Sequence, residues 1–424
     1  MKRIPFVKRD RELGLLDEAR EQGGLVVVFG RRRIGKTRML CRWIAEHNGL
    51  YSQAIETGFS QQVRQTYHDI VDSLDVRIEP ENWTDFFELL AAQKERWIFC
   101  LDEFPYLVAS DPSLPSRLQK WLDHDMPPGC LLILAGSSRT MMHQLFLNRS
   151  APLFGRALRI MQVGSMDYHA FCVALGLRPD VPESFEKFAC VGGVPKYWEF
   201  CESRQSVTEL ADSLYFDFAP YMEHEPHRML GDEGIAGQNA LSVLEAIGRG
   251  AERPSEIARR LGIPQTNLSR LFQQLLDGSV LMRELPFGES LRSTKRIFYR
   301  IEDPALRFCF RVYSPHRSLW HGYSEREKRE RIHQHAATVF EDWCRDRVTG
   351  ARRYWEKDLE IDFVAPLAGE GDGLLVAEVK WRRLSAAQRR KVERDLVEKW
   401  KRSTLAKRHG NVVFKVFDAG ELSA

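Results

Sequence analysis

The feature that most restricts the fold of this chain is a glycine-rich octapeptide that directly follows an apolar run. Residues 25–29, Leu-Val-Val-Val-Phe, predict a strand buried on both faces, as strands of a parallel sheet are. Residues 30–37, Gly-Arg-Arg-Arg-Ile-Gly-Lys-Thr, fit the pattern G-x-x-x-x-G-K-[ST] between a strand and a helix. Such a loop directs backbone N–H groups and a helix N-terminus at phosphate oxygens. We therefore predict an α/β fold with a parallel sheet and a phosphate-binding loop.

Each residue type in this loop has a chemical reason. The glycines permit backbone dihedrals that a Cβ atom would forbid. The lysine is expected to reach the β- and γ-phosphates of a nucleotide, and the threonine hydroxyl is expected to bind Mg²⁺. The candidate nucleotide-binding residues of the loop and the start of its helix are Gly30, Arg31, Arg32, Arg33, Ile34, Gly35, Lys36, Thr37 and Arg38.

A second apolar run ends in two acidic residues. Residues 97–101, Trp-Ile-Phe-Cys-Leu, predict another buried strand, and Asp102 and Glu103 follow it. A carboxylate at the end of a strand beside the loop can hold magnesium, and the adjacent glutamate can orient and deprotonate a water molecule. We therefore predict Thr37 and Asp102 as the magnesium ligands and Glu103 as the catalytic base.

A third apolar run, residues 130–135, is followed by Gly-Ser-Ser-Arg. A hydroxyl at this point can sense the γ-phosphate, so Ser138 and Arg139 are further candidate nucleotide contacts. Arg156 then follows a Pro-Leu-Phe-Gly turn and is a candidate arginine finger. A plain surface arginine on a turn is an equal alternative for Arg156.

Taken together, these segments resemble the archaeal-type ATPases, a STAND-like and AAA+-related group of P-loop ATPases. The resemblance implies ATP and Mg²⁺ as cofactors, ATP hydrolysis, a helical lid and self-association through the ATPase domains. It covers nearly the whole chain. Besides the segments above, it rests on the box Phe6-x-x-Arg9-x-x-Glu12-Leu13 and on Gly192-Gly-Val-Pro-Lys-Tyr197, which is similar to a motif of the family's lid.

The middle of the chain predicts a winged helix-turn-helix. A helix over 254–261 ends at Gly262, a second helix follows as far as Leu276, and residues 280–285 and 296–301 predict the hairpin of the wing. We expect the helix over 265–277 to contact DNA through its polar side chains. The alternative is a protein–protein module, because winged helices also serve in that role.

The last block predicts a helix, strands, a helix and a strand. Residues 359–364 alternate between apolar and polar and place Asp362 on the polar face of a strand. After a glycine-rich turn at 369–373, Glu378 and Lys380 share one face of the next strand because the strand period is two.

Two facing carboxylates of this kind can bind Mg²⁺, and a lysine beside them can activate a water or stabilise a phosphorane. Glu341, on the preceding helix, is a further candidate ligand. The set formed by Glu341, Asp362, Glu378 and Lys380 resembles the PD-(D/E)xK restriction-endonuclease-like superfamily, although the proline before Asp362 is absent. The alternative is that Glu-Val-Lys is simply the exposed face of an amphipathic strand.

Composition limits the remaining choices. The net charge is only +3, and no apolar run approaches the ~20 residues that cross a bilayer, so we expect a cytoplasmic protein with no membrane partner. The expected domains are 1–165 (P-loop ATPase core), 166–232 (helical lid), 233–315 (winged helix-turn-helix) and 316–424 (α/β nuclease-like domain). The stretch 314–330, with a proline, a glycine and a run of charges, is the expected linker.

The function that these motifs predict is an ATP-binding and ATP-hydrolysing protein that acts on DNA, with the ATPase state coupled to a metal-dependent nuclease-like domain. The alternative is a nucleotide-controlled switch that binds DNA or a protein partner and cleaves neither.

Overall fold

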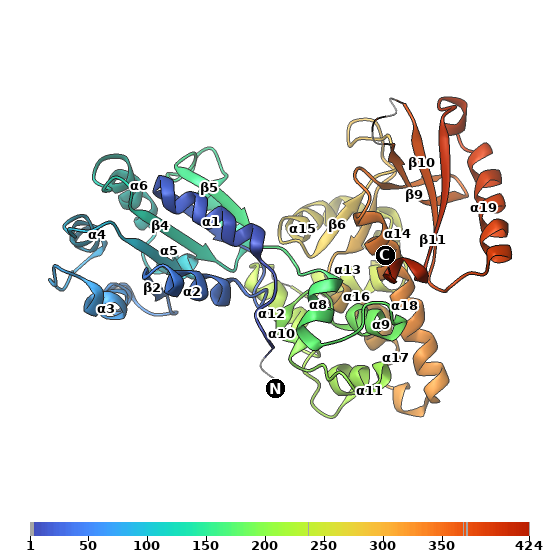
Figure 1. Ribbon diagram of the computed structural model, residues 1–424, viewed down its shortest axis with the longest axis horizontal. Coiled ribbons are helices and arrows are strands. Elements are labelled where there is room, and N and C mark those ends of the chain that lie inside the picture. Colours follow the sequence, from blue (N-terminus) through green and yellow to red (C-terminus); the bar gives the residue numbers. More distant parts are fainter. Residues whose placement is uncertain (1–3, 236, 368, 370–371, 424) are drawn as a thin grey trace.

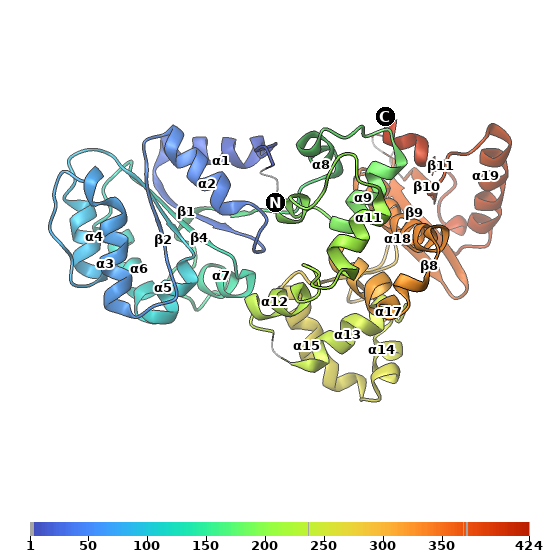
Figure 2. The same cartoon turned by 90° about the horizontal axis from the view of Figure 1, so that it is seen from below.

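The computed structural model describes residues 4–235, 237–367, 369 and 372–423. The chain forms two lobes, and both views show the N-terminal α/β lobe beside a larger lobe that holds the remaining elements (Figure 1, Figure 2). None of the helices in the described ranges is both long enough and apolar enough to span a bilayer.

The N-terminal lobe is built on a parallel sheet of five strands in the order β2-β3-β4-β1-β5. This confirms the α/β fold with a parallel sheet. The strand that precedes the glycine-rich loop lies next to the centre of the sheet and is buried almost throughout, as its apolar sequence predicts. The strands are β1 (Gly24–Phe29), β2 (Leu50–Gln53), β3 (Ile98–Asp102), β4 (Leu131–Gly136) and β5 (Ala157–Gln162).

Helices cover both faces of this sheet, because side chains alternate along each strand. Val26 and Val28 of β1 pack against one layer, formed by α1 (Asp10–Gln22) and α2 (Lys36–Glu46). Leu25 and Val27 face the other layer. The helices of that second layer are α3 (Phe59–Ile70), α4 (Trp83–Ala91), α5 (Phe104–Ser110), α6 (Leu114–His124) and α7 (Arg139–Phe146), with the 3-10 turn η1 (Val71–Ser73) between α3 and α4.

The expected lid is helical, but it packs against the C-terminal half of the chain. One continuous core joins the lid helices to the winged helix, to α18 (Glu325–Asp346) and to part of the C-terminal sheet. This core runs through both of the boundaries expected near residues 232 and 315. The lid elements are α8 (Tyr168–Leu175), α9 (Pro182–Val191), α10 (Pro195–Trp198), α11 (Val207–Ala211), the π-helical turn η2 (Asp212–Phe216) and α12 (Glu225–Asp232).

The winged helix consists of α13 (Gln238–Gly248), α14 (Pro254–Leu261), α15 (Gln265–Asp277), β6 (Leu281–Glu284) and β7 (Phe298–Ile301). Helix α14 ends at Gly262, which adopts the left-handed conformation (φ 68°), as its sequence predicts. Strands β6 and β7 pair antiparallel as the base of the wing.

The expected linker at 314–330 is wrong, because this stretch is folded and packed. Its proline lies in the short helix α17, which follows the π-helical turn η3 without a break. Trp320 is fully buried and stacks on Phe216 with 4.0 Å between the ring centroids. The elements around it are α16 (Pro304–Phe308), η3 (Cys309–Tyr313), α17 (Ser314–His316) and η4 (Trp320–Gly322), and α18 begins at Glu325.

The C-terminal sheet has four strands in the order β11-β10-β9-β8. Strands β8 to β10 are antiparallel, and β11 runs parallel to β10. One face packs against α19 (Ala386–Lys401), and the other contributes to the continuous core that includes α18. The strands are β8 (Arg352–Glu356), β9 (Leu359–Pro366), β10 (Leu374–Lys380) and β11 (Val412–Asp418), with η5 (Leu405–Lys407) before β11 and η6 (Ala419–Ser423) after it. Residues 370 and 371 of the glycine-rich turn lie outside the described residues.

Candidate functional site

The glycine-rich loop connects the end of β1 to the start of α2. A Cβ atom at Gly30 would lie 2.3 Å from the carbonyl oxygen of Val163, so only glycine fits at this position. Gly35 precedes α2 with φ 94°, which favours glycine for its conformation. Lys36 is the first residue of α2, and its Nζ donates hydrogen bonds to the carbonyl oxygens of Gly30 (2.7 Å) and Arg31 (3.2 Å). Two carbonyl oxygens of the loop therefore hold the ammonium group of its own lysine.

The two expected magnesium ligands lie side by side. Thr37 Oγ1 donates a hydrogen bond to Asp102 Oδ2 over 2.6 Å, and Tyr51 Oη donates to the same oxygen over 3.0 Å. Asp102 is fully buried at the end of β3. Burial lowers the pKa of Lys36, and the nearby Glu103 and Asp102 partly offset that effect. Tyr51 was not expected from sequence, because its role follows only from the pairing of β2 with β3.

Glu103 is held by the end of the neighbouring strand. Its Oε2 accepts hydrogen bonds from Ser137 Oγ (2.8 Å) and from the Ser137 backbone N–H (3.2 Å). Ser138, the expected hydroxyl, is buried, and its Oγ accepts a hydrogen bond from the Met141 N–H at the start of α7. Of the two serines, Ser137 is therefore the one that contacts the candidate base. Glu103 also lines a cavity of about 500 Å³, which Asp232 and Glu233 of the second lobe line as well.

Other expected nucleotide contacts occupy different positions. Arg139 lines a cavity of about 800 Å³ together with Gly30, Arg31 and Ile34. Arg38 points toward the N-terminal segment, where it donates a hydrogen bond to the Ile4 carbonyl oxygen over 2.8 Å.

The candidate arginine finger lies outside the phosphate-binding loop of its own chain. Arg156 forms an ion pair with Asp123 of α6 at 2.8 Å, and its Nη1 donates to the Pro152 carbonyl oxygen. Arg156 directly precedes β5, so it lies at the amino end of the parallel strands, whereas the phosphate-binding loop follows the carboxyl end of β1.

The three arginines of the loop all reach acidic residues from the second lobe. Arg31 forms an ion pair with Asp303 at 2.7 Å, and Arg32 forms one with Asp232 at 2.8 Å. Arg33 forms an ion pair with Glu225.

The acidic residues expected in the C-terminal block also come together. Glu378 of β10 accepts hydrogen bonds from Lys380 (2.9 Å) and from Lys399 of α19 (2.9 and 3.0 Å). Asp362 of β9 accepts one from the Val379 N–H over 2.6 Å. Lys399 was missed by the sequence analysis, because it lies on a separate element 21 residues after Glu378.

Burial and mutual repulsion shift these carboxyl groups. Burial raises the pKa of Asp362, and the charge of Glu378 adds to the rise. Burial likewise raises the pKa of Glu341 on α18, and Asp362 adds to it. Within the described ranges, His, Cys, Asp and Glu side chains form no group of three or more that could hold a metal ion.

The expected DNA-contacting helix presents a polar surface. Leu268, Phe272 and Leu275 of α15 are buried, and Leu271 is partly buried. The opposite side of the helix carries exposed hydrogen-bonding residues, namely Gln265, Thr266, Asn267, Ser269, Arg270, Gln273 and Gln274.

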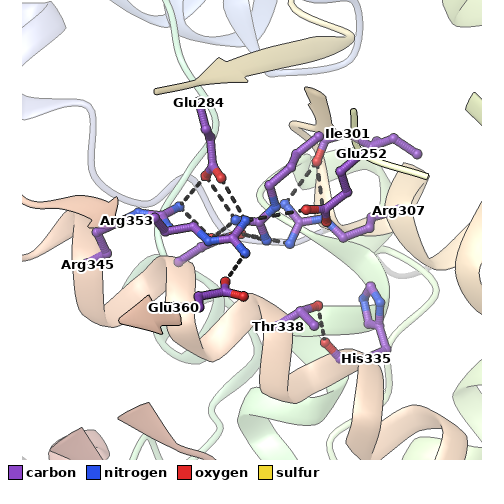
Figure 3. Close-up of polar contacts among 11 residues, drawn as sticks. Glu252, Glu284, Ile301, Arg307, His335, Thr338, Arg345, Arg353 and Glu360 are labelled. Atoms are coloured by element: carbon purple, nitrogen blue, oxygen red, sulfur yellow. Dashed lines mark hydrogen bonds and ion pairs between the residues drawn. The ribbon is translucent and has the colours of Figure 1, made fainter. Parts of the chain in front are cut away.

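A buried set of charges joins the wing to the C-terminal block, and we call it the junction network (Figure 3). Asp342 of α18 forms ion pairs with Arg300 (2.8 Å), Arg307 (2.7 Å) and Arg345 (2.6 Å). Glu284 of β6 forms ion pairs with Arg300 and Arg345 (both 3.0 Å) and with Arg353 of β8 (2.8 Å). The junction network consists of Glu284, Arg300, Arg307, Asp342, Arg345 and Arg353.

Two further contacts fix the wing in the same place. Phe298 of β7 stacks on Trp355 of β8 with 4.3 Å between the ring centroids and 5° between the ring planes. The N–H group of Phe287 in the wing donates a hydrogen bond to the Arg353 carbonyl oxygen over 2.8 Å.

The chain is similar to several known proteins along most of its length. The "Uncharacterized protein MJECL04" of Methanocaldococcus jannaschii is 26% identical over 419 residues, covering 93% of this chain and 92% of that protein. The ORC2 protein of Aeropyrum pernix aligns with a TM-score of 0.45 and 12% identity over 80% of this chain and 97% of its own. A STAND protein with a tetratricopeptide repeat sensor from Pyrococcus horikoshii aligns with a TM-score of 0.33 and 15% identity over 80% of this chain and 49% of its own.

Family models match three separate segments. Residues 238–283 match the IclR helix-turn-helix domain, which agrees with the expected winged helix, and residues 310–392 match a family described as archaeal and bacterial proteins of unknown function. Residues 6–197 match an ATPase domain that occurs predominantly in Archaea, and this match includes the glycine-rich loop, Asp102 and Glu103. The N-terminal part of the chain is thus similar to an ATPase domain found predominantly in Archaea, and residues 238–283 are similar to a helix-turn-helix domain.

Proposed function

We propose that this protein binds and hydrolyses ATP at the carboxyl ends of β1, β3 and β4 and uses the nucleotide state to control a DNA-binding winged helix. One observation carries the ATPase part. Thr37 meets Asp102 at 2.6 Å, while Glu103, the next residue, is held by Ser137 at the end of the neighbouring strand. The match of residues 6–197 to an ATPase domain supports the same reading.

The residues of this site fit a magnesium–nucleotide complex. Thr37 and Asp102 would hold Mg²⁺, which supplies positive charge to the phosphates when bound. Lys36 binds the β- and γ-phosphates after leaving the Gly30 carbonyl oxygen. Glu103 orients and deprotonates the attacking water, with one of its oxygens fixed by Ser137.

Two variants separate nucleotide binding from hydrolysis. Glu103→Gln keeps the shape of the side chain but removes the base, so kcat for ATP hydrolysis should fall roughly 10²-fold or more while ATP still binds. Lys36→Ala should abolish binding itself. Glu95→Gln, which changes an exposed carboxylate just before β3, is the matched control and should retain wild-type rates. The ATPase proposal fails if the wild type neither binds nor hydrolyses ATP in the presence of Mg²⁺.

The exposed polar side of α15 and the helix-turn-helix match support DNA as the partner of the winged helix. Arg270→Ala should weaken binding to duplex DNA and reduce its salt dependence, because one phosphate or base contact is lost. Fluorescence anisotropy with a labelled duplex at several salt concentrations measures both effects. Binding that is insensitive to Arg270, or absent, would favour a protein partner for this module.

A metal-dependent nuclease activity is a second candidate, favoured by the meeting of Glu341, Asp362, Glu378 and Lys380. The charge of Glu378, which two lysines hold, acts on the buried carboxyl group of Asp362, and the charge of Asp362 acts in turn on Glu341. The surrounding order of a helix, three antiparallel strands, a helix and a parallel strand supports the proposal of a nuclease-like fold.

Plasmid and single-stranded DNA, incubated with Mg²⁺ or Mn²⁺, test this second candidate. Glu378→Ala should abolish cleavage, whereas Glu393→Gln, which changes an exposed acid on α19, should not. If the wild type leaves both substrates intact, the better reading is a nucleotide-controlled switch. That switch would show an ATP-dependent change of molecular size that Lys36→Ala abolishes.

A further inference from the structure

Each arginine of the phosphate-binding loop is engaged by a carboxylate from the other lobe. Arg31 meets Asp303, which lies between β7 and α16, and the Arg31 guanidinium also donates a hydrogen bond to Tyr197 Oη over 3.0 Å. Arg32 and Arg33 meet the two ends of α12, at Asp232 and Glu225. Asp303 and Glu225 are almost completely buried. These contacts connect residues 30–33 to parts of the chain about two hundred or more positions away.

A fourth carboxylate covers the neighbouring strand end. Glu233, which follows α12, accepts hydrogen bonds from the N–H groups of Arg139 (3.3 Å) and Thr140 (3.1 Å) and from Thr140 Oγ1 (3.1 Å). These donors lie at the start of α7, two and three residues after the Ser137 that holds Glu103. Figure 2 shows α12 next to α7, between the two lobes.

We propose that Glu225, Asp232, Glu233 and Asp303, the covering carboxylates, occupy groups that a nucleotide's phosphates would otherwise bind, so that a triphosphate binds by displacing them. This inference rests on the proposed ATPase function and adds the residues that set its nucleotide affinity.

The chemistry of the donors supports such an exchange. Guanidinium groups and N–H groups at a helix N-terminus bind carboxylates and phosphates with the same geometry. Burial lowers the pKa of Arg31, but Asp303, Tyr197 and Glu225 together outweigh burial and raise the pKa, as expected for a guanidinium group held by 2.7 Å contact with a carboxylate. A triphosphate carries several negative charges in one molecule and can therefore replace several separate carboxylates together.

The displaced carboxylates sit where their movement would reach the DNA-binding module. Met229 and Leu230 of α12 belong to the core that includes the winged helix. Asp303 follows β7 of the wing by two residues. Exchange of carboxylates for phosphates would thus loosen the contact between the ATPase lobe and the lobe that carries α15.

Isosteric neutral variants test this exchange by the direction of the affinity change. Asp303→Asn keeps an oxygen that can accept the Leu306 N–H, as Oδ1 of Asp303 does over 2.8 Å, but it loses the charge that holds Arg31. Glu225→Gln does the same opposite Arg33. The matched control is Glu46→Gln, because Glu46 pairs with Arg42 on α2 within the ATPase lobe alone.

Binding of a fluorescent ATP analogue and of inorganic tripolyphosphate is measured for each variant with Mg²⁺ present. We expect Asp303→Asn and Glu225→Gln each to bind both probes about tenfold more tightly than the wild type, with Glu46→Gln unchanged. Unchanged or weaker binding by both variants would overturn the inference. Weaker binding would mean instead that these carboxylates contact the bound nucleotide.

Hydrogen exchange of the full chain gives a readout that does not depend on nucleotide binding. Without nucleotide, residues 225–233 should exchange faster in Asp303→Asn than in the wild type, while the strands β1 and β4 keep their protection. Equal exchange in the two proteins would overturn the inference. If the wild type binds no nucleotide but this difference appears, the proposed function fails while the contact between the lobes is still shown to depend on Asp303.

Discussion

Two clusters of arginines and carboxylates hold this protein together, and they differ in how easily they can change partners. In the junction network, Asp342 and Glu284 contact arginines from four elements, and every guanidinium in it is no more than 13% exposed. Between the lobes, each loop arginine pairs with one carboxylate, and Arg32 is 49% exposed. Both clusters use the same chemical groups, so they differ in the elements on which the arginines lie and in how exposed the arginines are.

The elements that carry the arginines determine whether the ion pairs of each cluster can exchange partners. The arginines of the junction network lie on four elements, namely β7, α16, α18 and β8. Each of these elements is held by its own backbone hydrogen bonds. The other three arginines stand on a glycine-bounded loop whose natural ligand, in our proposal, is an anion. We therefore regard the junction network as permanent and the contacts between the lobes as exchangeable.

The variant with the largest expected effect neutralises Asp342, which pairs with three arginines of the junction network. Asp342→Asn leaves Arg300, Arg307 and Arg345 buried without their shared carboxylate, so we expect a loss of about 3–5 kcal/mol in the free energy of unfolding. Urea denaturation followed by tryptophan fluorescence measures it. Glu398→Gln, in an exposed pair with Lys401, is the control and should change stability by less than about 0.5 kcal/mol. A loss below about 1 kcal/mol for Asp342→Asn would show that the junction network is not a permanent connection.

The second test uses pH and two neighbours on α18. Burial raises the pKa of Glu341, so the folded state holds its proton more tightly than the unfolded state does. The stability that the wild type gains from the protonated Glu341 is therefore present below about pH 4 and is lost as pH rises above the ordinary carboxyl range. Glu341→Gln stays neutral, so its advantage over the wild type should grow with pH to roughly 1–3 kcal/mol at pH 8.

Asp342 provides the opposite case at the next position. Burial alone would raise its pKa, but Arg300, Arg307 and Arg345 outweigh that effect and lower it. Its contribution to stability is present above the ordinary carboxyl range and disappears only in strong acid.

Thermal unfolding from pH 4 to pH 8 compares the wild type with Glu341→Gln, and parallel curves for the two proteins would contradict the predicted shift in the pKa of Glu341.

The smallest expected effect concerns the most exposed contact between the lobes. Arg32 and Asp232 are 49% and 24% exposed, so salt screens this pair and its contribution is at most about 0.5 kcal/mol. Asp232→Asn should therefore tighten binding of the ATP analogue by about twofold at low salt and not measurably at 0.5 M salt. A tenfold effect that persists at high salt would show that Asp232 is as firmly engaged as the buried Asp303.

Sequence predicted the parts of the fold and of the site that depend on local patterns. The apolar run at 25–29 and the spacing of Gly30, Gly35 and Lys36 are enough to predict a strand, a loop and a helix in succession. The acids at 102–103 were placed correctly at the end of a neighbouring part of the sheet, because parallel strands present their carboxyl ends on one edge. The helices of the winged helix and its hairpin were also predicted from their own periodicity and turns.

The remaining features depend on contacts between distant segments, which leave no local signal. Lys399 reaches Glu378 from a separate helix, and Asp232 reaches Arg32 across 200 positions. The charge run at 326–331 suggested an open linker, yet the neighbouring Trp320 is buried against Phe216 because the helix after it docks on the lid. The choice between Ser137 and Ser138 was decided by the backbone at the end of β4, which the sequence does not specify.

The stacking of Phe298 on Trp355 has a consequence for any duplex that the protein holds. The hairpin beside α15 is anchored to the edge strand of the C-terminal sheet. A duplex lying along α15 would meet the C-terminal strands at an angle set before binding. Adjustment of fit would then have to come from bending of the DNA, so sequences that bend easily should be favoured over stiff ones.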